Sequence, residues 1–331
     1  MKVRVLAVIG IFFIGAAAGF LISRSFATPQ QIQANGDSTA YQVRQGGYKL
    51  INPLLECEIG EKTLTKEYIS FKYKVEREIA KLKAQGTVAG IAVYFRDLNN
   101  GLGFGVNQTL EFSPASLLKI PVMMAYFKAQ EADPKLFSQK YEYTGLRDLD
   151  EMENIKPSQS MEAGKEYSVE DLLYRMIVFS DNNAMALLVE NLPLSIQDRV
   201  YKDLGITIPG VRGTEDYMTV ADNASFLRIL YNASYLSKND SEKALSLLTK
   251  VDFAEGIRAG VPKTAIVANK FGERVYNGQY QLHDCGIVYL KNHPYLLCMM
   301  SRGNDLKKLA SSLTTISGIV YTEARRQTNN R

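Results

Sequence analysis

A serine and a lysine three residues apart, Ser116 and Lys119, form the pattern best suited to covalent chemistry. They stand at the start of an apolar stretch, ASLLKIPVMMAYF, whose composition predicts a helix. Residues i and i+3 share a helix face, so the hydroxyl and the amine are expected to be neighbours. An amine whose pKa is lowered by burial can take the hydroxyl proton and activate the serine as a nucleophile. The alternative is that Ser116 only caps the helix.

A second polar group, Ser180-Asp181-Asn182, ends the apolar run DLLYRMIVF. Its serine and asparagine are two residues apart and can point into one site. There the hydroxyl would relay a proton and the amide would hold an amide of a ligand. The alternative is an ordinary polar turn between two helices.

A third group, Lys270-Phe271-Gly272, ends the strand-like run IVAN. Alternation along a strand sends Lys270 to the face opposite Phe271. Gly272 has no side chain, so the backbone of a ligand can approach it closely. The alternative is a plain strand end.

The elements that position these groups can be read from hydrophobic spacing. In chain order they are a helix over 68–82, strands over 90–97 and 102–107, a helical block over 116–235, strands over 266–272, 280–290 and 295–303, and a closing helix over 306–320. This order predicts an α+β fold, in which both ends of the chain build one antiparallel sheet. The terminal helices would cover one face of that sheet, and the middle of the chain would form an all-helical lobe.

The N-terminus predicts export from the cytoplasm. Lys2 and Arg4 precede an uncharged stretch over 5–22, which is at the lower limit of membrane-spanning length. Residues 1–27 are therefore expected to be an uncleaved membrane anchor or a signal peptide, with the anchor favoured, and 28–61 to be a linker and lead-in. The remainder would lie on the extracytoplasmic face of the membrane or be secreted. The net charge is +4, and the basic residues are not clustered in the way that would indicate a nucleic-acid partner.

Cysteine and histidine are scarce. Three cysteines, Cys57, Cys285 and Cys298, do not form a disulfide framework by count, and the last two are expected to be small core residues. No cluster suggests a metal, and we expect no cofactor. A Ser-His-Asp triad would have to use His283 or His293, since the chain has no other histidine.

The three polar groups, each present once and in this order, resemble the S-x-x-K, S-D-N and K-T-G motifs of class A β-lactamases and penicillin-binding proteins. The resemblance covers about residues 62–325. It implies a β-lactamase-like fold, with a sheet lobe over 62–110 and 256–325 and a helical lobe over 111–255, followed by a polar tail over 326–331.

The resemblance also implies a covalent mechanism and a role for each residue. Ser116 would attack a carbonyl, and Lys119 would act as base or proton relay. The backbone N–H groups of Ser116 and Glu273 would bind the oxyanion. Ser180 would pass a proton to the leaving nitrogen. The binding residues would be Asn182 for the substrate's side-chain amide, Lys270 for its carboxylate, and Gly272 and Glu273 along the strand.

The sequence departs from the family pattern in two places. Phe271 stands where a hydroxyl would bind the substrate carboxylate, so that binding would rest on Lys270, with Arg274 as an additional candidate cation. The stretch over 206–220 lacks the E-x-x-L-N segment whose glutamate activates the hydrolytic water, and Glu215 is the candidate replacement.

These features predict a serine hydrolase that acts on β-lactams or D-alanyl peptides through an acyl-enzyme. Without a well-placed base for deacylation, it would behave as a penicillin-binding protein or D,D-peptidase with a long-lived acyl-enzyme. A non-catalytic binding module that retains the fold is the alternative from a different class, and Phe271 is its best support.

Overall fold

The computed structural model describes residues 42–44, 46–57, 66–151, 153–208, 216–276 and 278–329. The predicted anchor or signal peptide over 1–27 and the candidate base Glu215 lie outside these ranges. Within them, no helix combines the length and the apolar character needed to cross a membrane.

A five-stranded antiparallel sheet forms the centre of the fold. In spatial order its strands are β4 (Gly103–Val106), β3 (Gly90–Asp97), β11 (Tyr295–Gly303), β10 (Gln279–Val288) and β9 (Val267–Tyr276). Two strands come from the first third of the chain and three from the last. This confirms the prediction that both ends of the chain build one sheet. It also makes β9, which carries Lys270, an edge strand.

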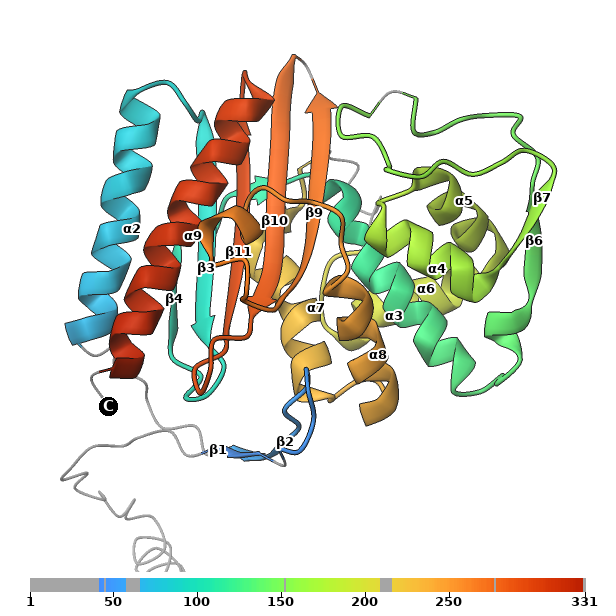
Figure 1. Ribbon diagram of the computed structural model, residues 1–331, viewed down its shortest axis with the longest axis horizontal. Helices are drawn as coiled ribbons and strands as arrows, with labels where there is room; N and C mark the ends of the chain where they lie inside the picture. Colours follow the sequence, from blue (N-terminus) through green and yellow to red (C-terminus); the bar gives the residue numbers. More distant parts are fainter. Residues whose placement is uncertain are drawn as a thin grey trace, which may run out of the picture. The chain divides into compact units, whose positions relative to one another are not determined.

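The two terminal helices pack side by side against one face of the sheet (Figure 1). They are α2 (Lys66–Ala84) and α9 (Leu306–Asn329). The apolar residues that predicted the first helix are all buried: Tyr68, Phe71, Val75, Ile79 and Leu82. The apolar residues of α9 that recur at helical spacing are likewise buried, and this side of the helix faces β10 and β11. Burial of these two stripes explains why both helices lie on the same face.

The middle of the chain forms the predicted helical lobe. Its helices are α3 (Lys119–Gln130), α4 (Val169–Val178), α5 (Asn182–Asn191), α6 (Leu194–Asp203), α7 (Val220–Asn232) and α8 (Lys238–Leu248). Helix α7 packs on β3, β10 and β11, on the face of the sheet opposite α9 (Figure 1). Helix α4 is capped by Ser168, whose hydroxyl accepts from the Asp171 N–H at 3.1 Å.

Short strands supplement the predicted elements. They are β1 (Gln42–Arg44) with β2 (Leu54–Cys57), β5 (Glu111–Phe112) with β8 (Met218–Thr219), and β6 (Lys140–Tyr143) with β7 (Lys165–Ser168). The helical lobe is therefore not purely helical. The stretch that joins β6 to β7 extends toward β9 (green in Figure 1), which makes it part of the site described below.

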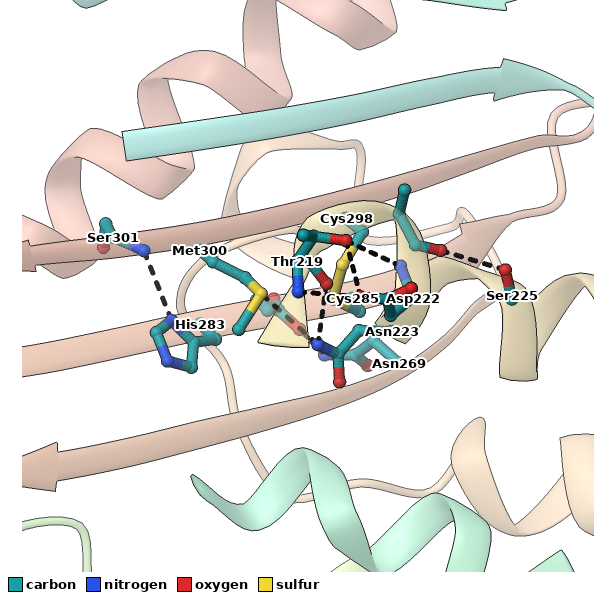
Figure 2. Close-up of a disulfide and its surroundings, with 12 residues drawn as sticks. Thr219, Asp222, Asn223, Ser225, Asn269, His283, Cys285, Cys298, Met300 and Ser301 are labelled. Carbon is teal, nitrogen blue, oxygen red and sulfur yellow. Dashed lines mark hydrogen bonds between the residues drawn. A yellow bond between two sulfur atoms is a disulfide. The ribbon is translucent and has the colours of Figure 1, made fainter. Parts of the chain in front are cut away.

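The prediction for the cysteines is wrong in one respect. Cys285 and Cys298 are fully buried, as expected, but they form a disulfide between β10 and β11. Figure 2 shows this bond, with Asn223 of α7 and Met300 of β11 nearby. The sequence did not indicate this pair, because an odd number of cysteines gives no complete set of disulfides. The two residues are directly opposite one another only through the register of two strands, which the sequence does not display.

Candidate active site

Ser116 lies in a single 3-10 turn, Ala115–Leu118, that leads directly into α3. The turn begins at Ala115, whose φ of +48° is in the left-handed region that alanine rarely adopts. The turn packs against β9 at Gly272, where a Cβ atom would be 3.0 Å from the backbone nitrogen of Ser116. The group that approaches Gly272 closely is thus the chain's own turn at Ser116, and this contact holds Ser116 beside the edge strand.

Lys119 is fully buried and reaches the hydroxyl of Ser116, with Nζ 2.8 Å from Oγ. The same Nζ lies 2.6 Å from the Ser180 carbonyl, 3.2 Å from the Ser180 hydroxyl and 2.6 Å from Asn182 Oδ1. Burial lowers the pKa of Lys119 from 10.5 to about 8, although the negative charges of Glu153, Asp150 and Asp181 oppose the shift. A neutral amine is therefore accessible near neutral pH, directly beside a hydroxyl.

Ser180 joins the two lysines of the site. Its hydroxyl accepts from Lys270 Nζ at 2.8 Å and lies within reach of Lys119 Nζ. Lys270 is also fully buried, and its pKa is lowered well below 10.5, first by burial and then by the nearby charge of Lys119. Ser116, Lys119, Ser180 and Lys270 thus form one continuous chain of hydrogen bonds.

Phe271 provides an aromatic face in place of a hydroxyl. Lys270 Nζ lies 4.1 Å from the centroid of the Phe271 ring. The ring itself is buried and stacks on Phe253, with the two centroids 4.3 Å apart. A cation above an aromatic face is attracted by the ring quadrupole, so Phe271 stabilises the buried ammonium form of Lys270.

The S-D-N turn is held by hydrogen bonds at each residue. Ser180 has a φ of +59°, and Asp181 caps α5 by accepting from the Ala184 N–H at 2.8 Å. The Asn182 N–H donates to Asp150 at 2.8 Å, and Asn182 Nδ2 donates to Glu153 at 2.7 Å. These bonds orient the amide of Asn182 so that its oxygen faces Lys119.

The side chain of Glu273 is a site feature that the sequence did not predict, because the family resemblance implies a role only for the backbone at this position. It is 7% exposed, and Oε1 accepts from the Ile155 N–H at 2.7 Å. Its pKa is raised by burial and by the neighbouring carboxylate of Glu153. Asp150 is a second unpredicted residue, and burial raises its pKa to about 6.

Glu153, Asp150 and Ile155 belong to one segment, 148–151 with 153–156, which we call the strap. It lies in the connection between β6 and β7. It hydrogen-bonds to Asn182 at the start of α5 and to Glu273 on β9, so it connects the helical lobe to the sheet near the Ser116 cluster. No motif in its sequence, DLDEMENIK, marks it as part of the site.

The two histidines are not part of the cluster. Glu215 is outside the described ranges, and its neighbour Asp216 pairs with Arg302 at 2.8 Å. His283 is buried against the Ser113 carbonyl, where burial lowers its pKa to about 4, and His293 lies beside Asp97. Within the described residues neither histidine hydrogen-bonds Ser116, so no Ser-His-Asp triad is formed there. The same residues contain no group of three or more potential metal ligands.

Comparison with solved structures shows the same fold. The structure of PBP-A is 21% identical, with a TM-score of 0.63, and the match covers 76% of this chain and 96% of that one. A PBP-A mutant in an acyl-enzyme complex with penicillin-G is also 21% identical, with a TM-score of 0.64 and coverage of 81% and 100%. The class A beta-lactamase from Mycobacterium abscessus is 20% identical, with a TM-score of 0.64 and coverage of 75% and 98%.

Comparison at the sequence level gives the family. No curated protein matches the sequence. A family model described as "Beta-lactamase enzyme family" matches residues 74–324, about three quarters of the chain, and this span includes every residue of the cluster. With a match of that extent, the chain belongs to the beta-lactamase enzyme family.

Proposed function

We propose that this protein is a serine hydrolase that forms an acyl-enzyme at Ser116 with β-lactams or D-alanyl peptides. The observation that carries the proposal is the hydrogen-bonded chain from Ser116 through Lys119 and Ser180 to Lys270. A nucleophile beside a buried amine of lowered pKa, with a second hydroxyl in contact, has what acyl transfer requires.

In the proposed reaction, Lys119 takes the proton of the Ser116 hydroxyl while Oγ forms a bond to the substrate carbonyl carbon. The backbone N–H groups of Ser116 and Glu273 stabilise the resulting oxyanion. The close approach of Gly272 to the Ser116 backbone supports this pairing. The C–N bond then breaks, and the proton passes from Lys119 through the Ser180 hydroxyl to the leaving nitrogen.

The binding roles remain those that the family resemblance implies. Asn182 would hold the amide of the substrate side chain, and Lys270 would attract its carboxylate. The second role is weakened, because Lys270 is buried, bonded to Ser180 and covered by the ring of Phe271. We therefore propose weak recognition of the carboxylate and slow acylation by simple β-lactams.

The proposal is tested by exposing the purified protein to a fluorescent penicillin and measuring its intact mass. The wild type should gain the mass of one penicillin, and Ser116→Ala should gain none. Absence of a label on the wild type, or equal labelling of the variant, would count against an acyl-enzyme at Ser116.

The time course separates hydrolysis from stalled acylation. We propose that deacylation is slow, so β-lactam opening should show a burst of about one equivalent followed by stalling. Sustained turnover would indicate a working base, and loss of that turnover in Glu215→Gln would identify Glu215 as its source.

A binding module without activity is the second candidate, favoured by the single observation that Phe271 replaces the hydroxyl of the third motif. It requires reversible binding of the same ligands with no mass gain at Ser116. For location, we propose the extracytoplasmic face of the membrane, on the basis of the apolar N-terminal stretch. Membrane fractionation of the full chain, compared with a chain lacking residues 1–27, tests that placement.

A further inference from the structure

Two glutamate side chains lie beside the proposed nucleophile, one from each lobe. Glu153, in the strap, accepts from Asn182 Nδ2 at 2.7 Å, and the oxygen of the same amide accepts from Lys119. Glu273, in β9, directly follows the glycine that lies against the backbone of Ser116. Both carboxyl groups are therefore next to the residues that would bind the acyl part of a substrate.

One of these carboxyl groups is buried and only half satisfied. Oε1 of Glu273 accepts from the Ile155 N–H, whereas Oε2 is buried and has no hydrogen-bond partner among the described residues. The side chain is 7% exposed. A buried polar atom without a partner is costly, and a second carboxylate nearby increases the cost.

Lys119 and Lys270 interact electrostatically with Glu153, but neither forms an ion pair with this pair of carboxyl groups. None of the ion pairs within the described ranges involves Glu153 or Glu273. Lys156, the lysine of the strap, instead donates to the backbone carbonyls of residues 150 and 151. Oε2 of Glu273 can be satisfied by a proton held between the two carboxyl groups, or by an ammonium group of a bound molecule that replaces this proton. Glu153 is partly exposed, so such a molecule can approach from solvent.

We infer that Glu153 and Glu273 form a subsite for a positively charged amine on the acyl side of the substrate. This inference rests on the proposed function and specifies its substrate class. The ammonium group would donate to Glu273 Oε2 and to the carboxylate of Glu153.

Three penicillins that differ at one carbon test the subsite. Ampicillin carries an ammonium group on the side-chain α-carbon, benzylpenicillin a hydrogen and carbenicillin a carboxylate. A hydrogen bond to a charged group contributes about 1.5–3 kcal/mol, so ampicillin should acylate Ser116 about tenfold or more faster than benzylpenicillin. Carbenicillin should be slower than both. The rate constants are measured by intact mass, and equal rates for the three compounds would overturn the inference.

Variants locate the effect. Glu273→Gln and Glu153→Gln retain size and an acceptor oxygen but lose the charge, and each should bring the ampicillin-to-benzylpenicillin ratio close to one. Glu151→Gln, an exposed position in the same strap, is the matched control and should retain the wild-type ratio. Thermal unfolding shows whether each variant is folded. A preference that survives in both folded glutamine variants would contradict the assignment.

A binding measurement keeps the subsite distinct from the proposed chemistry if no penicillin acylates Ser116. Calorimetry on Ser116→Ala would compare L-lysyl-D-alanyl-D-alanine peptides that have the lysine ε-amine acetylated and the α-amine either free or acetylated. About tenfold tighter binding of the free amine, lost in the Glu273→Gln background, supports the subsite even without catalysis. Equal affinity, or no binding of either peptide, would overturn it.

Discussion

Lys119 illustrates how one residue depends on its burial for its chemistry. Desolvation brings its pKa to about 8, so the protonated form dominates below that pH and the neutral form above it. Only the neutral amine can accept the proton of Ser116. The rate of acylation by a penicillin should therefore rise about tenfold per pH unit from pH 6 toward 8 and then level off. Labelling rates across pH 6–9.5 check this, and a flat profile would exclude Lys119 as the base.

Phe271 shows at the same scale that a departure from a motif can have a structural role. The ring contacts Nζ of Lys270 and stacks on the ring of Phe253. A threonine at this position would restore the motif of the family but would leave a cavity where two rings now stack. Position 271 can therefore provide either a hydroxyl for a ligand or a ring that stacks on Phe253, but not both.

At the scale of elements, the position of the edge strand β9 is set by its pairing with β10, which in turn pairs with β11. Lys270 is directly opposite Cys285 of β10, which is directly opposite Cys298 of β11. The disulfide closes a loop with a sequence separation of 13 residues. The double variant Cys285→Ala with Cys298→Ala should lower the free energy of unfolding by about 3 kcal/mol. Urea unfolding followed by far-UV circular dichroism measures this, since the chain has no tryptophan.

A reductant provides the control for the disulfide. Reduction of the unfolded wild type should bring its midpoint down to that of the double variant, whereas the double variant should not respond. Identical midpoints for the oxidised wild type and the double variant would mean that the bond adds nothing to stability.

At the scale of the whole described fold, the strap connects the helical lobe to the sheet. Its tie to β9 is the bond from the Ile155 N–H to Glu273, and its tie to the helical lobe includes the bond from the Asn182 N–H to Asp150. Removing one tie should let the strap open more often, because local opening depends on the few bonds that hold a segment. Glu273→Ala should speed hydrogen exchange at Ile155 about tenfold or more, as measured by mass spectrometry of peptides from the strap.

The matched controls for this experiment are Glu273→Gln and Glu151→Ala. The first retains an acceptor for the Ile155 N–H, and the second alters an exposed side chain of the same segment. Both should exchange at the wild-type rate. Unchanged exchange in Glu273→Ala would show that the strap is held by other contacts.

The sequence by itself determined the main elements and the identity of the cluster. Hydrophobic spacing located the two terminal helices and the long strands, because the apolar face of a helix or strand must be buried against some neighbouring element, whichever element that is. The groups at 116, 180 and 270 could be identified together because their order resembles a known family pattern, whereas each group alone also fits an ordinary cap, turn or strand end. These groups prove to be hydrogen-bonded to one another.

Only the tertiary structure decided the contacts between segments that carry no local signal. Glu153 and Glu273 are 120 positions apart in the numbering, and they meet because the strap crosses from one lobe to the edge of the sheet. Cys285 and Cys298 pair because of a strand register, and Lys119 has its lowered pKa because of what buries it. Register and burial are properties of the packed chain, which is why neither could be read from residue types and spacing alone.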